Sequence, residues 1–191
     1  MIRFFSVLLV TVLTTAWATC QCDLAIDTVD EFDGTRLVST DPFNIGYFVP
    51  SEYETTEGVK MVEEGKFAFT YSENDSISSF FMIIAAAERQ YLPINSGFNV
   101  LLKLGNEQIV GLLNTPDRGT FDRNTNMRIY QHTCVVPLDI YYNLIHFPIE
   151  KIRIEYQGHK STLTLTPEQQ EKIRDSLICV GQTVGLFPVK P

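Results

Sequence analysis

The sequence has little tryptophan, histidine or positive charge. Its one tryptophan is Trp17, and its three histidines, His132, His146 and His159, are not at the spacing of a helical metal-binding pair. The 15 Lys and Arg residues are outnumbered by 23 Asp and Glu residues, which gives a formal net charge of −8. Nucleic-acid binding needs clustered cationic side chains, so we predict no nucleic-acid partner. The negative charge favours solubility.

The sequence also lacks the familiar catalytic and cofactor motifs. It has no glycine-rich phosphate loop, no dinucleotide-binding fingerprint and no Gly-x-Ser-x-Gly turn. We therefore predict no catalytic residue, no cofactor and no metal site. His132 and Cys134 share one face of a predicted strand, as a base and a thiol nucleophile would. Cys134 is better explained as half of a disulfide or as a buried thiol.

Long apolar runs are missing outside the N-terminus, so we predict no transmembrane span. At the N-terminus, Arg3 precedes an apolar stretch from Phe4 to Leu13, and Ala16 and Ala18 suit signal peptidase. This pattern predicts an exported protein, periplasmic or extracellular. The predicted organisation is a signal peptide (1–18), a β-rich globular domain (19–181) and an extended tail (182–191).

The protein has four cysteines, and an even number in an exported chain predicts disulfides. The candidates are Cys20, Cys22, Cys134 and Cys179. A Cys20–Cys22 bridge would be strained, so we expect the N-terminal arm to pair with Cys134 and Cys179. A lipid on Cys20 is the alternative. It would leave an odd number of thiols, and Thr19 suits lipidation poorly.

Alternation of apolar and polar residues predicts a mainly β fold. It is clearest over residues 66–73 and 150–157, and an apolar run over 77–89 predicts a central strand. Residues 98–114 predict a hairpin with a two-residue turn at Gly105 and Asn106, and with Phe98 on the face of Val100. Two further segments predict helices: residues 137–147, and a longer helix capped by Thr166 with Pro167 and Gln169 behind it. We predict a single β-sandwich or a partly open β-barrel of about eight strands, with a C-terminal α-helix.

Four stretches of the chain resemble uncharacterised exported bacterial proteins of β-rich type. The resemblance implies a β fold and a bacterial origin, and it implies no activity and no functional residue. Lipocalin-like carriers resemble one another in a Gly-x-Trp motif, which this chain lacks because Trp17 lies in the predicted signal peptide. The four stretches are Asp30–Arg36, Leu101–Asn114, Ile149–Tyr156 and Thr166–Ile173.

The sequence therefore predicts a non-enzymatic binding or structural module of the cell envelope or extracellular space. One alternative is a carrier of a small apolar ligand inside a β-barrel, and another is a hydrolase whose site is assembled from distant residues. The expected partner is accordingly a protein or a small apolar ligand, and no oligomeric state is predicted. Lys151 and Arg153 are interpreted as a solvated sheet face. The candidate binding patch is a cluster of four aromatic residues: Phe43, Tyr47, Phe48 and Tyr53.

Overall fold

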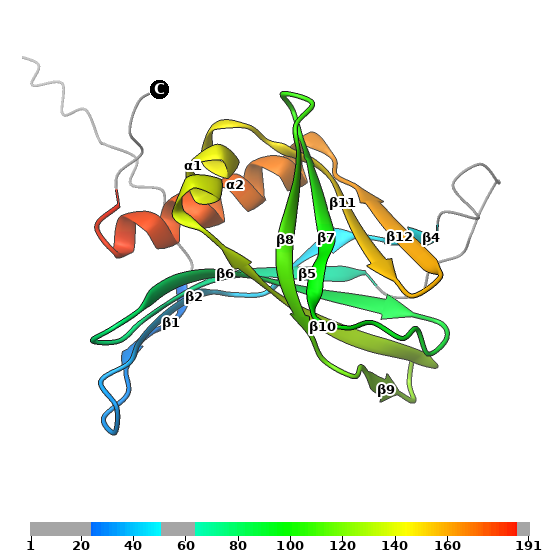
Figure 1. Ribbon diagram of the computed structural model, residues 1–191, viewed down its shortest axis with the longest axis horizontal. Coiled ribbons are helices and arrows are strands. Elements are labelled where there is room, and N and C mark those ends of the chain that lie inside the picture. Colours follow the sequence, from blue (N-terminus) through cyan, green and yellow to red (C-terminus); the bar gives the residue numbers. More distant parts are fainter. Residues whose placement is uncertain (1–23, 51–63, 187–191) are drawn as a thin grey trace, which may run out of the picture.

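The computed structural model describes residues 24–50 and 64–186. These residues form a mainly β protein with a C-terminal helix, as the sequence predicts (Figure 1). The strands are β1 (Leu24–Val29), β2 (Arg36–Thr40), β3 (Phe43–Gly46), β4 (Val49–Pro50), β5 (Gly65–Glu73), β6 (Ser78–Glu88), β7 (Gly97–Leu104), β8 (Ile109–Pro116), β9 (Thr120–Asp122), β10 (Met127–Val136), β11 (Ile149–Tyr156) and β12 (His159–Thr164). The helices are α1 (Leu138–His146) and α2 (Pro167–Thr183).

The strands belong to one 12-stranded sheet, which is antiparallel and open. Its order is β1-β2-β5-β6-β10-β8-β7-β11-β12-β4, with β3 beside β5 and β9 beside β10. Glu88 at the end of β6 is hydrogen-bonded to Ser161 on β12, although four strands separate β6 from β12 in this order. The sheet is therefore strongly curved without being a closed barrel. The strand count exceeds the expected eight partly because β3, β4 and β9 are too short to show a periodic pattern.

The two helices lie on one side of the sheet, over its concave face (Figure 1). The ring of Tyr141 on α1 stacks on Phe80 with ring centroids 4.7 Å apart, and Phe80 stacks on Phe69 at 5.4 Å. The Tyr141 hydroxyl donates a hydrogen bond of 3.3 Å to the carbonyl oxygen of Leu177 on α2. Aromatic stacking and this hydrogen bond thus fix α1 against both the sheet and α2, which itself also packs on the sheet.

The predicted start of α2 is confirmed in detail. The Thr166 side chain accepts from the backbone N–H of Gln169, the Gln169 side chain caps Thr166 in return, and Pro167 follows the cap. The helix continues through Gln182 to Thr183, so its last two residues fall in the segment predicted to be extended. The remainder of that tail beyond residue 186 lies outside the described residues.

The hairpin of β7 and β8 is confirmed, but its turn is not the predicted one. Positive φ occurs at Glu107, with φ 67°, and the Leu104 N–H donates to the Gln108 carbonyl oxygen across a three-residue loop. The prediction that Phe98 shares the buried face of Val100 is also wrong, since the Phe98 side chain is 70% exposed. A register shift between Gly97 and Val100 turns Phe98 away from the core face.

Candidate functional site: a convex-face groove and a buried polar network

The four aromatic residues of the predicted patch do not form one exposed cluster. Phe48 is 2% exposed and belongs to the core, so its assignment to a surface patch is wrong. Phe43 is partly buried, with the Lys172 ammonium 4.5 Å above its ring. Tyr47 is 42% exposed, and Tyr53 lies outside the described residues. The aromatic spacing was misleading because the alternation breaks at Gly46, whose φ is 98°, so that Tyr47 faces solvent and Phe48 enters the core.

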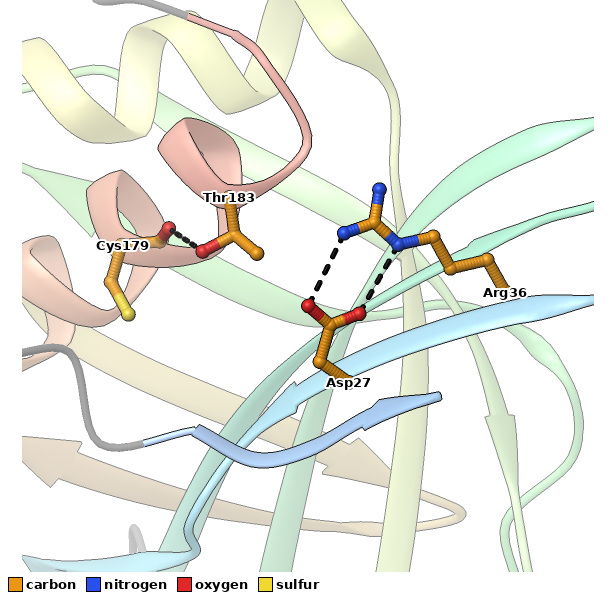
Figure 2. A network of polar contacts seen from close by, with 4 residues as sticks. All are labelled: Asp27, Arg36, Cys179 and Thr183. Carbon is orange, nitrogen blue, oxygen red and sulfur yellow. Dashed lines mark hydrogen bonds and ion pairs between the residues drawn. The ribbon is translucent and has the colours of Figure 1, made fainter. Parts of the chain in front are cut away.

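Two of the four candidate cysteines lie in the described part of the chain, and they do not pair with each other. Cys134 is a buried free thiol, whereas Cys179 is disulfide-bonded. Figure 2 shows Cys179 on α2, where its carbonyl oxygen accepts a hydrogen bond of 3.0 Å from the Thr183 hydroxyl. The expected bridge from the N-terminal arm to Cys134 is therefore wrong. Cys20 and Cys22 lie outside the described residues, so the partner of Cys179 stays a prediction.

A chain of hydrogen bonds crosses the concave side of the sheet from β8 to β11. The Asn114 Nδ2 atom lies 3.1 Å from Nδ1 of His132, and Nε2 of His132 lies 3.4 Å from the Tyr156 hydroxyl. Since the Asn114 amide nitrogen is a donor, Nδ1 accepts and the imidazole proton is on Nε2. The Cys134 thiol completes this end of the network by facing Asn114 Oδ1 at 3.9 Å.

The other end of the network joins β6 to β12. Ser161 Oγ donates a hydrogen bond of 2.7 Å to Glu88 Oε1 and lies 3.3 Å from Nε2 of His159. Tyr156 and Glu88 lie close enough for each to affect the pKa of the other, which links the two ends. Burial raises the pKa of the Glu88 carboxyl, and the hydrogen bond from Ser161 opposes that rise.

The network is buried, and burial opposes the charged forms of Glu88, His132 and Cys134. Burial lowers the pKa of His132 to about 4 and raises the pKa of Cys134 to about 12. Cys134 and Ser161 are fully buried, so neither the Cys134 thiol nor the Ser161 hydroxyl is accessible to a substrate. Within the described part of the chain, every buried side-chain N or O atom has a hydrogen-bond partner. These properties favour a structural role, in which the network fixes the curvature of the sheet.

The opposite, convex face of the sheet carries a groove with a volume of about 220 Å³. Cross-strand pairing builds its walls, because Lys103 on β7 is opposite Ile109 on β8 and Lys151 on β11. In the next outward-facing row, Leu101 is opposite both Gly111 and Arg153. Six residues line the groove: Leu101, Lys103, Ile109, Lys151, Arg153 and Thr162.

The groove combines apolar and positively charged groups. Leu101 and Ile109 supply the apolar surface, and three of the six lining side chains are cationic. Lys103 is positioned by two carboxylates, with Glu107 at 2.8 Å and Glu150 at 3.4 Å. A groove of this kind can hold a ligand that carries both an apolar part and a negative charge.

Arg153 and Gly111 determine the shape of the groove. Arg153 Nε donates a hydrogen bond of 3.0 Å to the Thr162 hydroxyl, which fixes the guanidinium along β12. Gly111 has no side chain, and a Cβ there would lie 3.5 Å from Leu101 Cδ2, so a larger residue would intrude on the apolar part of the groove.

The groove was not predicted from the sequence, where Lys151 and Arg153 read as a solvated face. Alternation places Lys151 and Arg153 on the outer face of β11, but alternation does not show which strands pair with β11. The useful signal was Gly111, since a glycine inside a strand pattern often marks a close approach or a depression.

No helix among the described residues is long and apolar enough to cross a membrane. In the same ranges, no three His, Cys, Asp or Glu side chains are grouped so as to hold a metal ion. Comparisons with protein-family models, with curated proteins and with solved structures found no match to this chain.

Proposed function

We propose that the protein is an exported, non-enzymatic binding module that takes an apolar anionic group into its convex-face groove. The observation that carries this proposal is the composition of the groove, in which Leu101 and Ile109 lie among three cationic side chains. All six lining residues are on β7, β8, β11 and β12, and strands paired in this way hold their side chains in fixed positions.

The concave side of the sheet supports a carrier function less well. A carrier of a small apolar ligand needs an internal cavity, whereas the concave face is occupied by large, fully buried side chains such as Tyr130, Phe69 and Tyr141. The hydrolase alternative is also less well supported by the polar network. Its Ser161 and Cys134 are fully buried, and a neutral thiol with a pKa of about 12 is a poor nucleophile.

The proposal can be tested with anilinonaphthalene sulfonate (ANS), a fluorescent probe that is both aromatic and anionic. We expect the folded protein to bind ANS and Lys151→Glu to weaken binding by about tenfold, because charge reversal removes an attraction and adds a repulsion. Gly111→Leu should weaken binding as well, because its side chain would occupy the groove.

Lys66→Glu is the matched control, since Lys66 is an exposed lysine on β5, outside the groove. It should leave ANS affinity within about twofold of the wild-type value. Equal ANS affinity in the wild type, Lys151→Glu and Gly111→Leu would show that the groove is not the binding site.

A further inference from the structure

The turn between β1 and β2 presents a single aromatic side chain to solvent. Phe32 is 99% exposed at this turn. The turn is nevertheless well braced, because the Phe32 N–H donates to Asp30 Oδ1 at 2.7 Å and the Thr35 N–H donates to Asp33 Oδ1 at 2.9 Å. Gly34 supplies the positive φ of 72° that closes it. A braced turn presents Phe32 with little loss of conformational entropy on binding.

The residues around Phe32 are acidic. Asp30, Glu31 and Asp33 flank the ring in the sequence, and in the described part of the chain none of the three forms an ion pair. The nearest basic residue of the hairpin, Arg36, is paired with Asp27 at 3.2 Å (Figure 2). The tip of the hairpin therefore offers one apolar ring surrounded by negative charge.

The convex-face groove has the complementary chemistry, with apolar side chains beside cationic ones. We propose that the tip of the β1–β2 hairpin of one copy docks in the convex-face groove of a second copy. Phe32 then covers Leu101 and Ile109, and its acidic neighbours face Lys151. This inference rests on the proposed function of the groove and names the group that fills it.

The positions of the two surfaces determine the kind of assembly. β1 is at one end of the sheet order, whereas β7, β11 and β12 lie toward the other end (Figure 1). A hairpin at one end that docks in a groove at the other makes a heterologous, head-to-tail contact, which propagates into chains or closes into rings. One aromatic side chain and a small groove make a small interface, so the association should be weak and dependent on concentration.

Sedimentation velocity over a range of protein concentrations tests the proposal. The wild-type protein should associate as its concentration rises, and Phe32→Ala and Lys151→Glu should each remain monomeric. Ile77→Ala is the matched control, because Ile77 is 66% exposed at the neighbouring β5–β6 turn and should not affect association. Circular dichroism checks that each surface variant keeps the wild-type fold.

A mixing experiment distinguishes head-to-tail docking from other self-association. Phe32→Ala keeps an intact groove, and Lys151→Glu keeps an intact hairpin tip. An equimolar mixture of the two should therefore form dimers that do not grow further, although each variant alone is monomeric. Association that survives in both single variants, or a mixture that stays monomeric, would overturn the proposal.

The outcomes also separate this inference from the proposed function. If ANS binds in a Lys151-dependent way while the wild-type protein stays monomeric at every concentration, self-docking is wrong and the groove remains a binding site for another ligand. If Lys151→Glu changes neither ANS binding nor association, both proposals are wrong.

Discussion

Ser161 Oγ donates a hydrogen bond of 2.7 Å to Glu88 Oε1, and this bond joins the end of β6 to β12 across the concave side of the sheet. Both side chains are buried, so the carboxyl group has little access to water. The contact is the clearest evidence that the open sheet is held in a curved shape by polar groups as well as by packing. The same curvature fixes the strands that carry the convex-face groove.

Glu88 should make folding stability depend on pH. Burial raises the pKa of its carboxyl above the ordinary 4.5, so its contribution to stability is fully present below that value. The contribution is lost as the pH rises from there through the raised pKa. Glu88→Gln keeps an acceptor for Ser161 and cannot ionise. We expect its stability relative to the wild type to increase across this range in urea unfolding at several pH values. If the difference in stability between Glu88→Gln and the wild type stayed constant with pH, the Glu88 pKa would not be raised in the folded protein.

His132 should stay neutral well below physiological pH. Burial lowers its pKa from 6.5 to about 4, so its imidazole should titrate with a midpoint near 4 in an NMR pH series. Because the unfolded chain takes up this proton first, His132 should contribute stability above pH 6.5 that is lost as the pH falls toward 4. A midpoint near 6.5 in the folded protein would show that the ring is hydrated.

Cys134 should be unreactive in the folded protein. Its thiol is buried and its pKa is raised to about 12, so little thiolate forms and reagents have no access to it. Iodoacetamide labelling followed by peptide mass spectrometry should find Cys134 unmodified under native conditions and modified in guanidinium. Rapid native labelling would indicate that β10 opens locally or that the thiol is exposed.

Gly181 should not tolerate even a methyl group. A Cβ at this position would collide with the Tyr141 hydroxyl, which is held by Leu177. We expect Gly181→Ala to lower the free energy of unfolding by roughly 1–3 kcal/mol, although alanine has the higher helix propensity. Gly97→Ala is the control, because among the described residues the only heavy atom within 4 Å of its Cβ would be Asn99 Nδ2 at 3.8 Å, so it should change stability little. Equal unfolding midpoints for the two variants would show that α1 and α2 do not approach this closely.

The local elements of this fold follow from short-range patterns. The capping box at Thr166 and the alternation over β11 depend on neighbouring residues, so the sequence predicts them correctly. The strand β5 is also predicted, but its alternation is not, because Ala68 and Thr70 on the expected solvent face are buried as well. Phe98 shows the limit, because one register shift after Gly97 moves it from the core face to solvent. The close approach of Gly181 to Tyr141 depends on how α2 packs on α1, which no local pattern encodes.

The groove and the polar network depend on which strands become neighbours. The order of the sheet places β10 between β6 and β8 and places β7 between β8 and β11, so sequence distance does not predict these contacts. Glu88 and Ser161 are 73 residues apart in the chain. Their residue types did not indicate a buried pair, because isolated Glu and Ser residues in strand patterns are usually solvated.

Chemical-shift mapping of the protein with ANS tests the central claim most directly, because it locates the bound probe. We expect the largest amide shifts at Leu101, Lys151 and Arg153, with smaller shifts on β8 and β12 and none on α2. Shifts confined to other strands or to the helices would contradict the assignment of the convex-face groove as the binding site.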